Sequence, residues 1–86
     1  MEENKKMEEI ASVLEPVTRD TSIPRNIRRS ADEAKNTLLD TSQDIGVRVS
    51  SAIYLLEEIS NDRNLPLHAR TLIWNVASEL ETIKLD

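Results

Sequence analysis

The sequence predicts an all-α fold in which four amphipathic helices pack as one antiparallel bundle. Three observations lead to this prediction. Apolar residues recur at three- and four-residue steps along the whole chain, which is the helical period. Glycine occurs once in 86 residues, which argues against tight β-hairpins and glycine-rich phosphate loops. Two stretches near residues 10–40 and 52–82 are alike, which is typical of a duplicated helical unit.

The first predicted helix covers Glu3–Arg19. Its apolar stripe consists of Met7, Ile10, Leu14 and Val17. Pro16 interrupts the pattern, because proline lacks a backbone N–H and its ring clashes with the preceding turn. We therefore expect a kink in this helix, or its end, near Glu15.

The second predicted helix covers Ile23–Leu39. Its apolar stripe consists of Ile23, Ile27, Ala31, Ala34 and Leu38. Pro24 falls in the first turn, where a missing N–H is tolerated. Ser22 precedes this proline by two residues, and we predict that its side chain caps the helix by accepting from an unpaired backbone N–H.

The third predicted helix covers Ile45–Ser60, and the fourth covers Leu65–Lys84. Asp44 is the predicted N-cap of the third helix and Asn64 that of the fourth, where Pro66 again occupies the first turn. The third stripe consists of Val49, Ala52, Leu56 and Ile59, widened by Ile53 and Leu55. The fourth consists of Leu65, Ala69, Leu72, Val76, Leu80 and Ile83, with Ile73 and Ala77 alongside.

An internal repeat links the two halves of the chain. A shift of 42 residues places "LEPVTRDTSIPRNIR" over "LEEISNDRNLPLHAR". The period is close to that of HEAT units, and "DIGVR" resembles the HEAT pattern of Asp, Pro, any residue, Val and Arg, with Ile45 in the proline position. We predict two HEAT-like helical hairpins that bury their apolar faces against each other in a single domain, residues 1–86. A dimer that extends the stack is the alternative.

Each copy of the repeat carries an aspartate eight residues before an arginine. The pairs are Asp20 with Arg28 and Asp62 with Arg70. Eight residues span the loop and the first helical turn, so the carboxylate can reach back to the guanidinium group. We predict that these four residues brace the two hairpins, with a contribution of about 0–1 kcal/mol for an exposed pair.

The composition limits the classes of function. A net charge of -5 and a pI near 4.8 are unlike those of a protein that coats nucleic acid uniformly. The absence of cysteine excludes disulfides and thiolate zinc sites. The first residues are charged and no apolar run approaches about 18 residues, so we expect a cytoplasmic protein without a membrane-spanning helix.

The sequence contains no recognisable catalytic constellation. His68 is the only histidine and lacks a suitably spaced ligand, so a hydrogen-bonding role near the start of the fourth helix is the simpler interpretation. Ser50 and Ser51 lack the glycine elbow of hydrolases. Neighbouring carboxylates such as Glu57 and Glu58 diverge by about 100° on a helix. We predict no enzymatic activity, no metal and no cofactor.

Three arginines lie near the predicted start of the second helix. Arg25, Arg28 and Arg29 follow Pro24, at a helix end whose free N–H groups favour anions. A solvated helix face is the simpler interpretation of Arg25 and Arg29. A small contact surface for RNA or another polyanion is the alternative, and its binding would be weak and sensitive to salt.

A flank of the fourth predicted helix carries the only tryptophan. Trp74 shares this flank with Leu67, Arg70 and Thr71. We favour an indole that covers a groove between helices. The alternative is that it anchors an interface, because tryptophan is enriched among the residues that dominate binding energy. The flank is therefore a candidate interaction surface for a protein partner or a second copy of the chain.

Two long segments carry a resemblance to a known family. "DTSIPRNIRRSADEAKNTLLD" and "AIYLLEEISNDRNLPLHARTLIWNVASELETI" resemble the archaeal proteins grouped as Uncharacterised Protein Family 0147. The resemblance covers the chain from about Met7 to Ile83, with Pro16 and Ile45 as departures. It implies a small four-helix fold and no assigned activity, cofactor or catalytic residue, so it transfers no functional residue to this chain.

These observations favour a protein of unknown function that acts as a non-enzymatic protein–protein interaction or self-association module. The alternative is an accessory factor that binds RNA or another polyanion through Arg25, Arg28 and Arg29. The two differ in salt dependence, because salt weakens a charged patch far more than an apolar interface.

Overall fold

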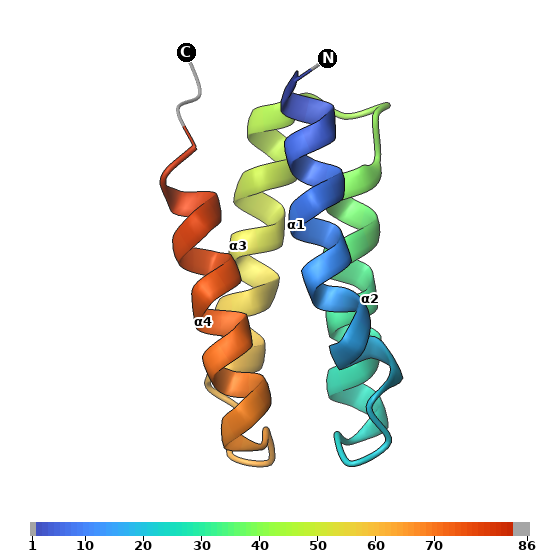
Figure 1. Ribbon diagram of the computed structural model, residues 1–86, viewed down its shortest axis with the longest axis vertical. Coiled ribbons are helices and arrows are strands. Elements are labelled where there is room, and N and C mark those ends of the chain that lie inside the picture. Colours follow the sequence, from blue (N-terminus) through green and yellow to red (C-terminus); the bar gives the residue numbers. More distant parts are fainter. Residues whose placement is uncertain (1, 84–86) are drawn as a thin grey trace.

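The computed structural model describes residues 2–83, in which four helices and no strand are present. The helices are α1 (Glu2–Arg19), α2 (Arg25–Leu39), α3 (Ile45–Ser60) and α4 (Leu67–Glu81). They lie side by side along an axis of 36 Å (Figure 1). The α1–α2 and α3–α4 loops lie at one end of the molecule, and the α2–α3 loop lies at the other, close to the start of α1.

Two predicted helix starts were two residues too early. α2 begins at Arg25 and α4 at Leu67, each directly after a proline. Pro24 and Pro66 are extended, with ψ of 146° and 150°, and therefore stand outside the helices. The predicted fourth helix was also too long, because α4 ends at Glu81; its predicted last residue, Lys84, lies outside the described residues.

The predicted caps of α2 and α4 were wrong, and the predicted cap of α3 is confirmed. Asp44 accepts a hydrogen bond from the backbone N–H of Gly46 at 3.3 Å. Ser22 and Asn64 instead donate their backbone N–H groups to aspartates two residues earlier in the loops, at 2.9 and 2.8 Å. An aspartate side chain readily accepts from the backbone N–H two residues later, which produces a local turn at Ser22 and Asn64 in place of a helix cap.

Helix α1 continues past Pro16, so the expected end near Glu15 was wrong. Pro16 is exposed, whereas Val17, the next residue, is only 3% exposed. The free energy gained by burying Val17 favours a continued helix, and it offsets the cost of the one hydrogen bond that is lost at the proline.

The core is entirely aliphatic apart from the thioether of Met7, and it matches the predicted stripes of α1, α2 and α3. In α4 the predicted stripe is confirmed except at one position: Ile73, predicted alongside it, is fully buried, whereas Leu72 is partly exposed and packs at the edge of the core. Each fully buried leucine or isoleucine contributes about 1.5–3 kcal/mol through removal of apolar surface from water. This burial is the main stabilising term of the fold.

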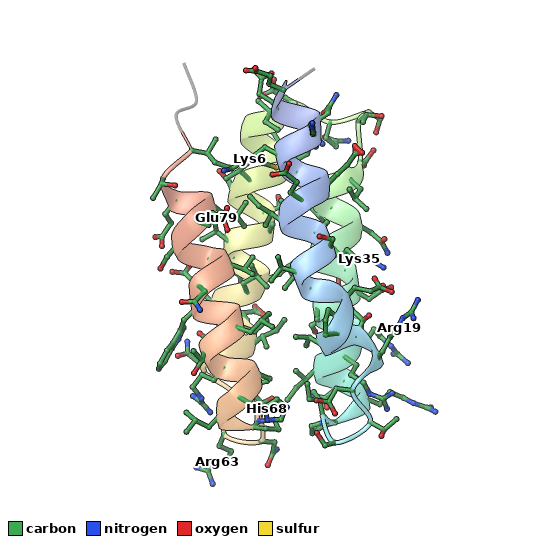
Figure 2. All side chains as sticks on the ribbon, viewed as in Figure 1. Lys6, Arg19, Lys35, Arg63, His68 and Glu79 are labelled. Carbon is green, nitrogen blue, oxygen red and sulfur yellow. The ribbon has the colours of Figure 1, made fainter. Side chains whose placement is uncertain are left out.

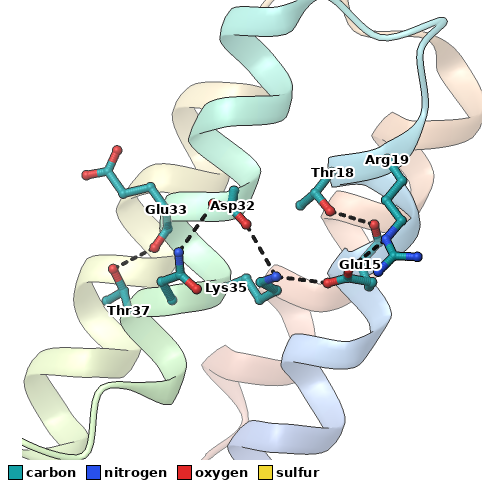
Figure 3. A network of polar contacts seen from close by, with 8 residues as sticks. Glu15, Thr18, Arg19, Asp32, Glu33, Lys35 and Thr37 are labelled. Atoms are coloured by element: carbon teal, nitrogen blue, oxygen red, sulfur yellow. Dashed lines mark hydrogen bonds and ion pairs between the residues drawn. The ribbon is translucent and has the colours of Figure 1, made fainter.

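A polar network ties α1 to α2 beside the core (Figure 3). Lys35 Nζ lies 2.9 Å from Glu15 Oε2 and 3.3 Å from Asp32 Oδ1. Arg19 Nε donates to the other oxygen of Glu15, also at 2.9 Å. The bond from Lys35 is the main cause that lowers the pKa of the Glu15 carboxyl. These groups are partly exposed, so the network fixes geometry more than it adds stability.

Candidate interaction surfaces

The outer flank of α4 exposes apolar side chains. Leu67 is 74% exposed and Trp74 is 54% exposed. They lie seven residues, or about two turns, apart and so share one face of the helix. Thr71 lies between them and is exposed, and its hydroxyl donates to the carbonyl of Leu67 at 3.2 Å. Together with Arg70 these residues form what we call the α4 flank.

Trp74 lies outside the core. Its neighbours Ile73 and Val76 are 0% and 1% exposed, yet more than half of the Trp74 side chain faces solvent. The helices that pack against α4 therefore do not enclose the indole. The sequence left two roles for the Trp74 indole, namely covering a groove between helices and anchoring an interface. Its exposure favours the interface anchor.

The two aromatic residues of the chain are both on the surface. Tyr54, on α3, is 64% exposed, and Trp74, on α4, is 54% exposed. Aromatic side chains are enriched at protein interfaces, where a large rigid surface becomes buried at a low cost in side-chain entropy. The fold is thus complete without its aromatics, which leaves both available for contacts with another molecule.

Arg70 is turned towards its own hairpin. Its guanidinium donates to the backbone carbonyls of Ser60 at 2.7 Å, Asp62 at 3.1 Å and Leu65 at 3.3 Å. These carbonyls belong to the end of α3 and the α3–α4 loop. A cation at a helix C-terminus satisfies carbonyls that have no partner within the helix. Within the α4 flank, Arg70 therefore supports the backbone beneath the apolar side chains.

The carboxylates of Asp20 and Asp62 are not the acceptors of the bracing arginines; Arg70 bonds to Asp62 only through its backbone carbonyl. Arg28 donates through Nε to the carbonyl of Ile23 at 3.0 Å. Among residues 2–83, no ion pair joins Asp20 to Arg28 or Asp62 to Arg70. The physical reason is that each aspartate side chain already accepts from a backbone N–H within its own turn.

Asp20 links the α1–α2 loop to the start of α4. Its Oδ1 accepts from the hydroxyl of Ser22 at 2.6 Å, and its Oδ2 lies 2.9 Å from Nε2 of His68. The hydroxyl of Ser22 and then the His68 ring lower the pKa of Asp20 to about 2. The predicted hydrogen-bonding role of His68 is confirmed by this contact, whose acceptor lies 48 residues away in the sequence.

Arg48 is a structural residue that the sequence analysis missed. Its side chain is 4% exposed, and Nε and Nη2 donate to the carbonyl of Leu38 at 3.0 and 2.6 Å. Nη1 donates to Oδ1 of Asn4 in α1 at 3.0 Å. The sequence held a signal: Asp40 precedes Arg48 by eight residues, as in the other two loops. The shift of 42 residues concealed this third copy, because it does not align the second loop with either of the others.

The chain segments at the end of the molecule formed by the α1–α2 and α3–α4 loops are rich in arginine (Figure 1), and Figure 2 shows Arg19 and Arg63 in this half of the molecule. Six of the seven arginines lie in residues 19–29 and 63–70, which form this end. Four of them are exposed: Arg19, Arg25, Arg29 and Arg63. We call these four the arginine end. Arg63 was missed because only the folded chain brings the α3–α4 loop to this end, and Arg19 because only arginines after the predicted start of the second helix were considered.

The described part of the chain contains no arrangement of three or more histidine, aspartate or glutamate side chains placed to hold a metal ion. Within the same residues, no helix is both long and apolar enough to cross a membrane. The surfaces that remain as candidates are the α4 flank, the arginine end and the grooves between helices.

A small protein of four helices with an aliphatic core and exposed aromatics is the class that this structure defines. The chain belongs to the Uncharacterised protein family UPF0147, whose model matches residues 1–83. UPF0147 proteins of Methanosarcina mazei and Thermococcus kodakarensis are 57% and 52% identical to it. The matches cover 86% and 91% of this chain and 80% and 95% of those proteins.

Solved structures show the same fold. A crystal structure of a protein of unknown function, 51% identical, matches with a TM-score of 0.87 over 93% of this chain and 91% of that one. A UPF0147 protein from Thermoplasma acidophilum, 26% identical, matches with a TM-score of 0.85 over 98% of this chain and all of that one. The family resemblance seen in the sequence is thereby confirmed, and the family is one of unknown function.

Proposed function

We propose that the protein is a non-enzymatic protein–protein interaction module whose contact surface is the α4 flank. A second copy of the chain is the first partner to test. The observation that carries the proposal is that Leu67 and Trp74 are 74% and 54% exposed on one face of α4, although the core is closed without them.

The position of α4 supports this proposal. The helix packs against α3 and α1 with its buried face, which leaves the α4 flank open. Tryptophan buries about 150–250 Å² when it is covered, and truncation of such an anchor typically weakens binding by about 2 kcal/mol or more. Arg70 stiffens the backbone at the start of α4, so the apolar side chains are held on a rigid support.

Sedimentation velocity over a series of protein concentrations tests self-association. We expect wild type to form a dimer as concentration rises, Trp74→Ala to remain a monomer, and Val13→Ala to behave as wild type. Val13 is a matched control because it is a 41% exposed apolar residue that belongs to α1 and not to the α4 flank. A monomer at every concentration in all three proteins removes the second copy as a partner.

A second candidate function is binding of RNA or another polyanion by the arginine end, together with Arg28. It is favoured by the position of these exposed arginines in segments that lie at one end of the molecule: Arg19 ends α1, Arg25 and Arg29 begin α2, and Arg63 lies in the α3–α4 loop. Arg63 thus extends the charged surface beyond the three arginines considered in the sequence, whereas Arg19 is already bonded to Glu15. The carboxylates of Asp20 and Asp62, which lie in the same loops, accept hydrogen bonds from backbone N–H groups of their own turns and, within residues 2–83, form no ion pair with these arginines. The few arginines available allow only a few phosphate contacts, so the binding would be weak and sensitive to salt.

Paired charge-removal variants test this candidate. Arg25→Ala/Arg29→Ala should weaken binding of a single-stranded RNA and reduce the slope of log affinity against log salt by about 2. Lys5→Ala/Lys6→Ala removes the same charge at the other end of the molecule and should leave binding unchanged. Equal losses in both variants would indicate unspecific attraction and would exclude the arginine end as a site.

The proposal includes an architecture of two HEAT-like hairpins, near residues 10–40 and 52–82, in one antiparallel bundle. The support is local: Asp20 and Asp62 accept the same turn hydrogen bond, and Pro24 and Pro66 adopt nearly the same dihedral angles. If the hairpins are equivalent, exchange of the two loop sequences should leave a folded protein, which circular dichroism and unfolding in urea would detect.

A further inference from the structure

A groove runs between α2 and α3 and is separate from the α4 flank. It is an open surface groove with a volume of about 610 Å³. Its apolar wall consists of Val47, Tyr54 and Leu55, all on α3. The opposite side is formed by residues of α2 and the α2–α3 loop, among them Glu33, Thr37 and Asp40. None of these residues belongs to the surfaces proposed above.

The apolar wall is open to solvent. Val47 is 50% exposed and Tyr54 is 64% exposed, and they lie seven residues apart on one helix. Between them the side chains are small, because Ser50 and Ser51 line the same groove. Two large apolar groups about two turns apart with small residues between them suit an amphipathic helix laid into the groove.

The accessible charges at the groove are acidic. Glu33 and Asp40 are exposed at its α2 side. The bonds from Ser42 lower the pKa of Asp40, so this carboxyl is ionised at neutral pH. On the α3 side, Glu58 lies next to Tyr54 and raises the pKa of its phenol through a hydrogen bond and its negative charge.

The one cation that lines the groove does not present its charge to a ligand. Arg48 is 4% exposed, and its bonded N–H groups are directed at the carbonyl of Leu38 and the amide oxygen of Asn4. A ligand in the groove would therefore meet apolar surface between carboxylates. Charge complementarity selects a basic ligand, and a second copy of this chain, with its net charge of -5, is a poor match.

We propose that the α2–α3 groove binds a basic amphipathic helix of a protein partner. Apolar side chains of that helix pack on Val47 and Tyr54, and its lysine or arginine side chains pair with Glu33, Asp40 and Glu58. The site does not depend on the α4 flank, so the two surfaces can serve two partners.

Fluorescence anisotropy with three labelled synthetic peptides tests this proposal. The first is an amphipathic helix of leucine and lysine, the second has glutamate in place of lysine, and the third has the composition of the first in a scrambled, non-amphipathic order. We expect the first peptide alone to bind. Equal binding of the scrambled peptide would reduce the effect to net charge and would overturn the proposal.

Variants of the protein locate the bound peptide. Tyr54→Ala and Val47→Ser should each weaken binding about tenfold, as expected for anchors of a small interface, and Glu33→Lys should weaken it in a salt-dependent way. Val13→Ser, a loss of exposed apolar surface on α1, should bind as wild type. Circular dichroism of each variant establishes that the fold is retained.

Trp74→Ala separates this proposal from the proposed function. If Trp74→Ala binds the peptide normally and Tyr54→Ala does not, the groove is the site, whatever the α4 flank does. The reverse pattern would place the peptide on the α4 flank, which would overturn the groove proposal and support the proposed function.

Discussion

At the scale of single residues, Arg48 carries the largest expected effect on stability. Among the described residues it is the one buried charged side chain, and it bonds the last turn of α2 to α1 through Leu38 and Asn4. Its substitution leaves a helix-end carbonyl without its donors in a buried place, and a buried acceptor without a partner costs about 1–3 kcal/mol.

We therefore predict that Arg48→Met lowers the free energy of unfolding by about 2 kcal/mol. Arg29→Met, at an exposed position of α2, should change it by less than about 0.5 kcal/mol. Unfolding in urea measures both. Equally small effects of the two substitutions would mean that the hydrogen bonds of the Arg48 guanidinium add nothing to the free energy of unfolding beyond what the apolar part of the side chain contributes.

Asp20 predicts a pH dependence. Its folded pKa of about 2 lies below the ordinary value of 3.8, so its ionised form stabilises the fold. This contribution is complete above the ordinary pKa and is lost as the pH falls from near 3.8 through about 2. Wild type should therefore be more stable than Asp20→Asn at neutral pH, and the difference should shrink over that acidic window.

An NMR titration of the Asp20 carboxyl carbon measures the same effect directly. The midpoint should lie near 2 in wild type and move towards 3.8 in Ser22→Ala, because the Ser22 hydroxyl is the main cause of the lowered pKa. A wild-type midpoint already near 3.8 would contradict the turn geometry described for the α1–α2 loop.

At the scale of elements, Pro16 is tolerated rather than required. It lies inside α1, is exposed, and removes one helical hydrogen bond. Pro16→Ala should raise the free energy of unfolding by about 1 kcal/mol or more, whereas Glu9→Ala on the exposed side of α1 should change it little. A loss of stability in Pro16→Ala would show that a bend at this position is needed for packing.

The loops give a further prediction at this scale. Because Arg28 bonds to the carbonyl of Ile23 and Asp20 bonds to Ser22 and His68, the two side chains act independently. In a double-mutant cycle, the stability losses of Asp20→Ala and Arg28→Ala should therefore add. A clear departure from additivity would restore the direct pairing that the sequence suggested.

The four helices could be predicted from the sequence because each carries a stripe of aliphatic residues at helical spacing, and the burial of these stripes determines which segments form helices. Their ends could not, since polar side chains in the loops bond within the turns rather than to the helix ends. Asp20 accepts from the backbone N–H and the hydroxyl of Ser22, so Ser22 does not cap α2, and Pro24 stays extended instead of entering the helix. In α4 the prediction placed Leu72 in the stripe ahead of Ile73, because both spacings suit a helix, and only packing in the folded chain buries Ile73 instead.

At the scale of the whole molecule, the sequence predicts which residues lie on one helix but not which loops meet. It grouped Leu67, Thr71 and Trp74 correctly on one face, because helical spacing is sufficient for that purpose. It did not bring the α3–α4 loop, with Arg63, to the end that holds the α1–α2 loop, nor Asp20 to His68, because these arrangements depend on the packing of the two halves. The arginine end and the α2–α3 groove could therefore be identified only in the folded structure.

The central claim, that the α4 flank binds another protein molecule, is tested most directly at Trp74. As the only tryptophan, it gives a single fluorine NMR signal when fluorinated tryptophan is incorporated. We predict that this signal shifts and broadens as the protein concentration rises, or on addition of a native extract from an archaeon that carries a UPF0147 protein. It should stay sharp in Leu67→Arg under both conditions. A sharp, unmoved wild-type signal in both would contradict the claim.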